Sequence, residues 1–406
     1  MECQGVNIYL RVMAVKWRNK GHEFDALAVE YKEKFQNKVV FIFGAGEMGA
    51  VYAKVLLHFG LLRGFIDNNK EKLGRFYCGQ KVISLDDYLA LTNEDAMIVV
   101  CVNMEHSREI VTQLLEKGLR EGKDFVRHTE YCNTIFPILL AYDRNQVFLP
   151  LVQISVTERC TLKCKKCAHA CNLVPYDADD LSFEKVCHSA DRLFSFVEYV
   201  QEFVLIGGEP FLYKALEDAI IYIGKKYRDK INIFSITTNG TVTPLNEVLK
   251  TCKQYGVLIR ISNYSKTLPR LNSHYDKLTA ALGQYEIPYI LGDKDAVWMD
   301  YGFEYVNRGG NSEQLTAVFD KCKTPCHEVR GDRFYFCVMA RSVAENMRKD
   351  VGINDYFDMQ QYKPGIDNKV FLEYIMGYSD KGYLDMCNYC HGGDTPKYPI
   401  PAAEQM

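Results

Sequence analysis

Residues 151–171 read LVQISVTERCTLKCKKCAHAC and place closely spaced cysteines directly after an apolar run typical of a buried strand. Cys160, Cys164 and Cys167 have the spacing C-x3-C-x2-C. Cysteine thiolates hold iron-sulfur clusters, and a four-iron cluster held entirely by protein needs four of them. Three thiolates on one short loop therefore predict a [4Fe-4S] cluster with one open iron, where a cofactor or substrate can be chelated.

Downstream of this loop, strand-like apolar runs alternate with helix-like stretches. The expected strands are 151–156, 202–206, 231–237 and 257–262, and the expected helices lie near 182–199, 213–227, 244–255 and 270–285. This alternation predicts parallel strands joined by right-handed crossovers, in an open sheet or in a complete or partial barrel. The cysteine loop follows the first strand, and the carboxyl ends of such strands are where these folds carry their sites.

Two more short motifs follow expected strands at the same edge. Gly207-Gly208-Glu209-Pro210 comes after the second strand, and Thr238-Asn239-Gly240 comes after the third. With the cysteine triplet, they resemble the signature of the radical S-adenosylmethionine (SAM) superfamily. The resemblance implies that the open iron binds the amino and carboxylate groups of SAM. It also implies that the GGEP element holds the SAM ammonium group and that the TNG element lies near the cofactor, with Ser262 as a further cofactor-binding candidate.

Two residues of the cysteine loop complicate this interpretation. Many superfamily members have an aromatic residue just before the third cysteine, where it touches the adenine, whereas this chain has Lys166. Adenine packing must then come from elsewhere. Cys171 adds a fourth thiol, so the alternative is a structural zinc or a closed cluster. If the radical SAM interpretation holds, removal of Cys171 preserves SAM cleavage.

A second group of cysteines lies near the end of the sequence. Its members are Cys322, Cys326, Cys337, Cys387 and Cys390, and Cys337 ends an expected hairpin, HEVRGDRFYFC, that turns at Gly331-Asp332. The spacing resembles the SPASM/twitch extension of some radical SAM enzymes, which implies an auxiliary [4Fe-4S] cluster held by Cys322 or Cys326 with the other three. The alternative is zinc bound by four thiolates, or by three thiolates and His391 or His327.

The N-terminal part of the chain carries a glycine-rich motif between an expected strand, 38–43, and an expected helix, 47–58. Gly44, Gly46 and Gly49 form G-x-G-x-x-G, and Asp67 ends the next expected strand, 64–67. In a Rossmann-like unit such glycines let the backbone approach a pyrophosphate, and the acid bonds a ribose hydroxyl. Glu47 opposes phosphate binding, so a unit whose glycines only make the turn, used for docking, is the equal alternative.

The predicted fold is α/β: an N-terminal Rossmann-like parallel sheet (1–148, with leading helices over 8–35), a partial (β/α) barrel radical SAM core (149–300) and a small irregular cysteine-rich region (301–406). The chain has 406 residues and a formal charge of −3, which offers no broad attraction for nucleic acid or an anionic membrane. We expect a cytoplasmic protein, because no apolar run reaches about 18 residues. The single cysteines Cys3, Cys78, Cys101, Cys132, Cys187 and Cys252 are interpreted as small apolar side chains.

The order of these regions resembles radical SAM proteins of bacterial capsule and cell-wall polysaccharide gene clusters, with IGGEPFLYKALED, CNYCHGG and IPAAEQ among the matching text. The leading hypothesis is an oxidoreductase that dehydrogenates a carbohydrate or polyol, including nucleotide-activated forms. The auxiliary cluster would accept one electron, and a flavodoxin or ferredoxin would serve as reductase. The rivals are a maturase or epimerase of a ribosomal peptide, an NAD-dependent sugar reductase and a non-catalytic iron-sulfur protein. No catalytic base is assigned; the weak candidates near strand ends are His169, Tyr176, Arg260 and Tyr264.

Overall fold

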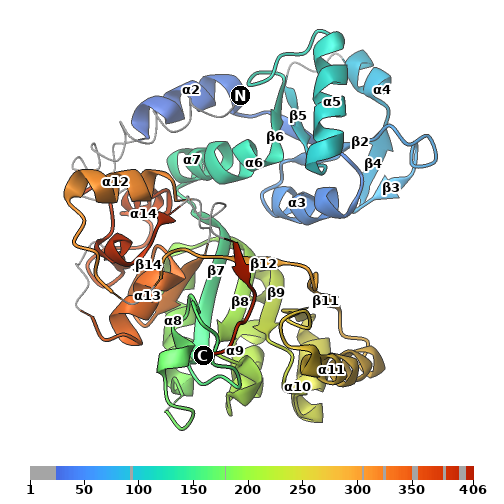
Figure 1. The fold of residues 1–406 in the computed structure, drawn as a ribbon. Helices are drawn as coiled ribbons and strands as arrows, with labels where there is room; N and C mark the ends of the chain where they lie inside the picture. Colours follow the sequence, from blue (N-terminus) through green and yellow to red (C-terminus); the bar gives the residue numbers. More distant parts are fainter. Residues whose placement is uncertain are drawn as a thin grey trace. The chain divides into compact units, whose positions relative to one another are not determined.

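A computed structural model describes residues 24–91, 95–178, 180–303, 306–322, 326–349, 355–377, 381–392 and 399–406. The described chain forms two compact units, Phe24–Asn145 and Gln146–Met406 (Figure 1). Cys3 and the first part of the expected leading helices, residues 8–23, lie outside the described residues. The described remainder of that stretch is a helix, α2 (Asp25–Phe35).

The first unit is built on a six-stranded sheet in the order β3-β4-β2-β1-β5-β6. Its strands are β1 (Val39–Phe43), β2 (Leu62–Ile66), β3 (Phe76–Tyr77), β4 (Gln80–Ile83), β5 (Ala96–Val100) and β6 (Phe125–Arg127). All neighbours are parallel except β3 and β4. The helical segments are α3 (Glu47–His58), α4 (Leu85–Ala90), α5 (Met104–Glu116), α6 (His128–Glu130), η2 (Tyr131–Ile135), α7 (Phe136–Leu139) and η3 (Leu140–Arg144). The predicted parallel α/β fold of this region is confirmed.

The second unit contains an eight-stranded sheet in the order β11-β10-β9-β8-β7-β13-β14-β15. Four parallel neighbours are the expected strands, β7 (Phe148–Thr157), β8 (Tyr199–Gly207), β9 (Ile231–Thr238) and β10 (Leu258–Ile261). A fifth parallel strand, β11 (Tyr289–Leu291), was not predicted. Within the described residues the sheet stays open, with β11 and β15 at its edges. The predicted partial barrel is therefore the observed form.

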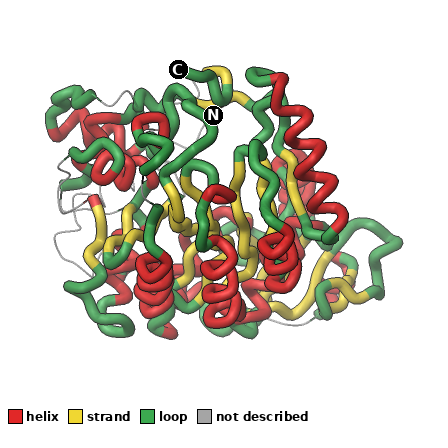
Figure 2. The backbone as a smooth tube through the Cα atoms, turned by 90° about the horizontal axis from the view of Figure 1, so that it is seen from below, coloured by secondary structure: helices red, strands yellow, loops and turns green. Residues whose placement is uncertain are grey.

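Helices connect these strands, and each helix buries one of its faces. They are α8 (Phe183–Phe196), α9 (Leu216–Tyr227), α10 (Asn246–Tyr255) and α11 (Asn272–Gln284), with the short turns η4 (Cys171–Leu173), η5 (Pro210–Leu212), η6 (Arg228–Lys230) and η7 (Pro269–Leu271). Ser182 caps α8 by accepting from the backbone N–H of Lys185, and Gly256 ends α10 in the left-handed conformation. In Figure 2 the helices line one side of the row of strands.

The C-terminal cysteine region continues the same sheet. The expected hairpin is confirmed as β13 (His327–Arg330) and β14 (Arg333–Tyr335), which are antiparallel, and β15 (Tyr356–Asp358) follows β14. β13 runs parallel to β7, with His327 opposite Val152. Around them lie α12 (Ser312–Asp320), α13 (Val338–Glu345), α14 (Asn368–Ile375) and η9 (Asp385–Tyr389), and a separate two-stranded sheet pairs β12 (Val297–Met299) with β16 (Pro399–Pro401). A division at residue 300 stays a prediction, since both parts belong to one compact unit.

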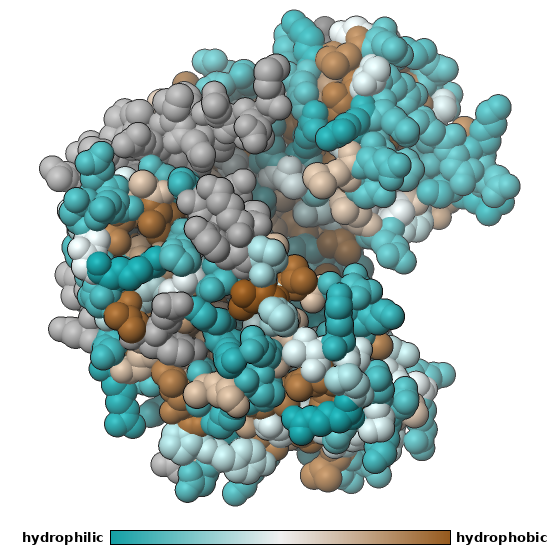
Figure 3. Space-filling model, viewed as in Figure 1, coloured by the Kyte–Doolittle hydropathy of each residue, from teal (hydrophilic) through white to brown (hydrophobic). Residues whose placement is uncertain are grey.

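The surface in Figure 3 is mainly hydrophilic on both units, with apolar residues scattered between. Among the described residues, no helix combines the length and the apolar character needed to cross a membrane.

Candidate functional site

The three cysteines of the first loop line one pocket at the carboxyl ends of β7 to β10. The pocket has a volume of about 420 Å³. Predicted site residues in its wall are Cys160, Cys164, Cys167, Gly207, Gly208, Thr238, Asn239 and Ser262. Cys160 and Ser262 are about 100 residues apart in sequence, yet both line this cavity. One part of the wall is rich in thiols and another part is polar, as expected from motifs that follow neighbouring strands.

The two glycines of the GGEP element let the end of β8 lie against the cysteine loop. A Cβ atom at Gly207 would lie 2.0 Å from the carbonyl oxygen of Thr157, and one at Gly208 would lie 2.1 Å from that of Arg159. The backbone N–H of Gly208 donates to Thr157 O at 2.8 Å. Any side chain at these positions would push the cysteine loop away from β8, so the glycines fix where the thiols lie.

Glu209 is completely buried and does not line the pocket. Its carboxylate accepts from Thr238 Oγ1 at 2.8 and 2.9 Å and from the backbone N–H of Asn239 at 2.9 Å. Burial raises its pKa to about 7, although these hydrogen bonds act in the opposite direction. Glu209 therefore holds the TNG turn in place, and Pro210 begins the adjoining η5 turn. Direct contact of Glu209 with the SAM ammonium group stays a prediction.

Asn239 joins the TNG turn to the first cysteine. Its Nδ2 lies 3.4 Å from Cys160 Sγ and 3.2 Å from Thr161 Oγ1. The backbone N–H of Leu162 also donates to Cys160 Sγ at 3.4 Å. Burial raises the pKa of Cys160 to about 11, so the thiol gives up its proton when a metal binds rather than before.

Cys171, the fourth thiol of the loop, lies behind the pocket and is not among its lining residues. Its sulfur lies 3.7 Å from Glu158 Oε2, and its one S–H is hydrogen-bonded to Cys167. That bond lowers the pKa of Cys167 to about 7 and raises the pKa of Cys171. Three thiols therefore face the cavity, and the fourth supports one of them.

A buried ionic cluster lies beneath the loop, and sequence reasoning missed it. The Arg341 side chain is 0% exposed, and its Nη1 is 2.8 Å from Glu158 Oε1, while its Nε is 2.9 Å from Glu328 Oε1. Its Nη2 donates to His169 Nδ1 at 3.0 Å. Burial and the guanidinium charge lower the pKa of His169 to about 3. The ring is therefore neutral with its hydrogen on Nε2, and it can serve the pocket as a donor rather than as a base.

Aromatic side chains form part of the pocket wall. Tyr264, Trp298 and Tyr301 line it, and the rings of Tyr264 and Trp298 meet edge to face at 5.6 Å. Lys166 also lines the pocket, with its Nζ 3.4 Å from Asp300 Oδ2. The residue before Cys167 is not aromatic, but residues 264–301 provide three aromatic rings in the same pocket. Trp298 and Tyr301 carried no local motif that could have marked them.

The other weak candidates lie elsewhere. Arg260 forms a two-point ion pair with Glu202, at 2.6 and 2.9 Å, which occupies its guanidinium group. Tyr176 is 55% exposed. Neither residue is among those that line the pocket.

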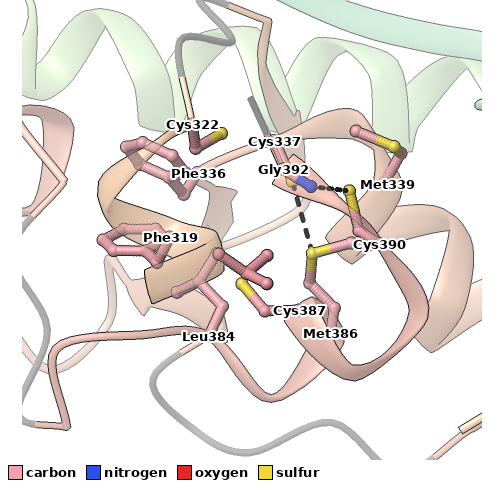
Figure 4. Close-up of a pocket in the computed structure, with 11 residues that line it drawn as sticks. Phe319, Cys322, Phe336, Cys337, Met339, Leu384, Met386, Cys387, Cys390 and Gly392 are labelled. Carbon is pink, nitrogen blue, oxygen red and sulfur yellow. Dashed lines mark hydrogen bonds between the residues drawn. The ribbon is translucent and has the colours of Figure 1, made fainter. Parts of the chain in front are cut away.

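Four of the five C-terminal cysteines line a second, almost filled pocket with a volume of about 20 Å³. They are Cys322, Cys337, Cys387 and Cys390, and Figure 4 shows their sulfurs around a common space flanked by Phe319 and Phe336. The backbone N–H of Gly392 donates to Cys390 Sγ at 3.3 Å, and the thiol of Cys337 lies 3.8 Å from Met386 Sδ. The pocket thus contains the three cysteines common to both predicted sets, and Cys322 rather than Cys326 as the fourth.

The remaining candidates for this second set do not line its pocket. Cys326 carries a backbone oxygen that accepts from Val338 N at 3.0 Å. His327 Nδ1 is 2.7 Å from the Phe336 carbonyl oxygen, and His391 Nδ1 is 2.6 Å from Arg308 Nη1. Among the described residues, no group of three or more His, Cys, Asp or Glu side chains is close enough to hold a single metal ion. This holds for both cysteine sets.

The glycine-rich loop of the first unit makes close contacts with neighbouring residues of the same unit. A Cβ atom at Gly49 would lie 2.0 Å from Gly44 O, so this glycine lets α3 lie close to β1, whereas Gly46 has open space. Asp67 accepts from the backbone N–H of Ala45 at 2.9 Å and pairs with Lys72 Nζ at 2.9 Å. Burial raises the pKa of Asp67, but its hydrogen bonds outweigh this and lower it overall. Nucleotide binding by Gly44, Gly46, Gly49 and Asp67 stays a prediction.

Comparison with known proteins identifies the core. Residues 154–279 match the model of the radical SAM superfamily, so this part of the chain is a radical SAM domain. This match, which covers about a third of the chain, supports an enzyme that uses a [4Fe-4S] cluster and SAM. The placement fits that implication, because three thiols line an open cavity while the fourth thiol of the loop lies behind it.

Solved structures with detectable similarity are distant. Native anSMEcpe with bound AdoMet and Cp18Cys peptide is 20% identical over 36% of this chain and 42% of that chain, with a TM-score of 0.29. BtrN in complex with AdoMet and 2-DOIA is 16% identical over 64% and 98%, with a TM-score of 0.40. Streptococcus suis SuiB bound to S-adenosylmethionine is 15% identical over 53% and 47%, with a TM-score of 0.29.

This chain spans less than half of the anSMEcpe chain that it matches. No curated protein matches the chain.

Proposed function

We propose that this protein is a radical SAM oxidoreductase that abstracts hydrogen from a carbohydrate or polyol and completes a two-electron dehydrogenation. The observation that carries the proposal is the cavity in which three cysteines face Thr238, Asn239 and Ser262. Cys160, Cys164 and Cys167 would hold a [4Fe-4S] cluster, which when bound would supply the electron for cleavage of SAM into methionine and a 5′-deoxyadenosyl radical. The chain's own contribution is to hold the thiols, orient SAM and exclude water.

Each proposed role is based on the position of a residue in or beside the cavity. Cys160, Cys164 and Cys167 hold the cluster. Glu209 fixes Thr238 and Asn239 through hydrogen bonds of 2.8 to 2.9 Å, so the polar wall is rigid before SAM arrives. Trp298 and Tyr264 supply apolar ring surface for the adenine, which takes over the task of the aromatic residue absent at Lys166.

The second thiol set supports the oxidative outcome. Cys322, Cys337, Cys387 and Cys390 are proposed to hold an auxiliary [4Fe-4S] cluster that accepts one electron from the substrate radical. Their surroundings are apolar, with Phe319, Phe336 and Leu384 in the wall. A closed four-thiolate site suits electron transfer, because it leaves no iron open to a ligand.

Substrate class and partners rest on the resemblance stated above and on chemistry. The resemblance to polysaccharide-cluster proteins favours a carbohydrate or polyol, including nucleotide-activated forms, over a peptide. A flavodoxin or ferredoxin is proposed as the electron donor. The first unit is proposed to bind a nucleotide or to dock a partner, and Asp67 would have to leave Ala45 and Lys72 to bond a ribose.

Anaerobic reconstitution tests the proposal. Iron and sulfide should each approach about eight per chain, for two four-iron clusters. Reduction in the presence of SAM should release 5′-deoxyadenosine, and a panel of polyols and nucleotide-sugars should yield a product two hydrogens lighter. Two clusters without any 5′-deoxyadenosine would contradict the proposal, as would NAD binding accompanied by sugar reduction without SAM cleavage.

A further inference from the structure

The segment Pro399–Met406 lies along the cysteine loop, far from it in sequence. The backbone N–H of Lys165 donates to Glu404 O at 2.7 Å, and that of Met406 donates to Lys163 O at 2.9 Å. Cys164 and Gln405 are paired as an antiparallel bridge. The segment therefore adds a short strand to the loop, centred on the middle cysteine.

The side chain of Gln405 is held at both ends of its amide. Oε1 accepts from the backbone N–H of Lys163 at 2.8 Å. Nε2 donates to the carbonyl oxygen of Ala403 at 2.7 Å and to Cys164 Sγ at 3.3 Å. A backbone N–H on one side and a carbonyl oxygen on the other allow one orientation of the amide, so its NH₂ group must face the sulfur.

The contact is partly shielded from water. Cys164 is 8% exposed, and Gln405 is half-buried. The Gln405 amide, whose Nε2 is 3.3 Å from Cys164 Sγ, stabilises negative charge on that sulfur. A hydrogen bond counts for more at such a site than in water, because the local dielectric constant is low.

The other end of the segment reaches the SAM cavity. β16 pairs with β12 in the register Val297 to Pro401 and Met299 to Pro399. Val297, Trp298 and Met299 line that cavity. The backbone of residues 399–406 is thus anchored on two sides, and the position of Gln405 does not depend on its own side-chain bonds alone.

We propose that Gln405 is a positioning residue that raises the reduction potential of the SAM-cleaving cluster through its hydrogen bond to Cys164. This inference rests on the proposed function. Hydrogen bonds to ligand sulfurs set the potentials of iron-sulfur clusters, and a donor stabilises the reduced, more negative state. Gln405 acts on Cys164 as Asn239 acts on Cys160, although Gln405 lies 241 residues from its cysteine and Asn239 only 79 from its own.

The test compares midpoint potentials of the full chain, reconstituted anaerobically and followed by electron paramagnetic resonance during a redox titration. Gln405→Leu removes both polar ends of the amide. Gln405→Glu keeps the acceptor for Lys163 and loses the donor to sulfur. Glu404→Gln is the matched control, because it removes only an exposed ion pair with Lys165, at 2.6 Å. A parallel titration in a Cys387→Ala background leaves one cluster to observe.

We expect Gln405→Leu and Gln405→Glu to retain iron and to shift the reduction equilibrium about tenfold toward the oxidised cluster, which is about 59 mV for a one-electron couple. Gln405→Glu should shift further because it adds a negative charge, and Glu404→Gln should not shift. Potentials equal to that of the control would overturn the inference, and so would loss of iron in both Gln405 variants. Failure of the unsubstituted chain to bind a cluster or cleave SAM would instead count against the proposed function.

Discussion

The two cysteine sets of the second unit differ in openness and in the number of thiols that face the cavity. The first presents three thiols to a cavity of about 420 Å³ with a polar wall, and the second presents four thiols to a space of about 20 Å³ with an apolar wall. In both sets, burial raises the pKa of most of the thiols. The two sets therefore differ in the size of the space beside the thiols and in the polarity of its wall.

The largest expected effect comes from removing the open set. The triple variant Cys160→Ala, Cys164→Ala, Cys167→Ala should lose about four irons per chain, one cluster's worth, and all 5′-deoxyadenosine formation. Iron analysis and chromatography of the reaction mixture measure both. Cys171→Ala is the matched control from the same loop and should still cleave SAM. Loss of cleavage in that control would show that Cys171 closes the cluster.

Removing one thiol of the second, C-terminal set should abolish product formation but not the cleavage of SAM. Cys387→Ala should lower iron from about eight to about four per chain and abolish the dehydrogenated product, while 5′-deoxyadenosine still forms. Cys326→Ala should leave iron unchanged, because Cys326 does not line the pocket. Mössbauer spectra with iron counts check both variants. An iron loss in Cys326→Ala equal to that in Cys387→Ala would reassign the ligand set.

Breaking the ionic cluster beneath the open set should destabilise the fold. Arg341→Met leaves Glu158 and Glu328 without their buried guanidinium partner, which we expect to cost about 3–5 kcal/mol in free energy of unfolding. Lys117→Met removes an exposed pair with Asp86 and should stay within about 0.5 kcal/mol. Urea unfolding of the two variants measures the difference. Equal midpoints would mean that the buried cluster contributes no net stability.

Glu209 should give the chain without clusters a pH-dependent stability. Its pKa is raised from 4.5 to about 7 on folding, so the folded state binds more protons between these values, and the free energy of unfolding falls as the pH rises through that window. The loss amounts to about 3 kcal/mol. Glu209→Gln should remove this slope, although it also loses one hydrogen bond at every pH. Thermal unfolding from pH 4 to 8 measures it, with the exposed Glu247→Gln as control; the same slope in Glu209→Gln as in the parent would disprove the assignment.

Much of the fold could be predicted from the sequence, because its signals are local. Alternating apolar runs predicted β7 to β10 and their helices, and the hairpin around Gly331 was predicted from its turn residues. Motifs placed after parallel strands must meet at one edge of a sheet, which is why the cysteine loop, Thr238-Asn239 and Ser262 were correctly expected to lie together.

The remaining features depend on tertiary contacts that no local pattern encodes. Arg341 reads as an ordinary charged helix residue, and only burial between Glu158 and Glu328 reveals its role. Gln405 and Trp298 come from segments far from the cysteine loop in sequence. The choice between Cys322 and Cys326 turns on which side chain lines the pocket, and spacing alone could not decide it.

The parallel pairing of β13 with β7 bears on how the chain can be cut for experiments. β7 has β8 on one side and β13 on the other, with Val152 opposite His327. A fragment that stops before residue 327 would keep the whole cysteine loop yet leave the β13-facing edge of β7 unpaired. Exposed edges of this kind promote aggregation, so we expect a minimal SAM-cleaving fragment to require the residues from 327 onward for solubility.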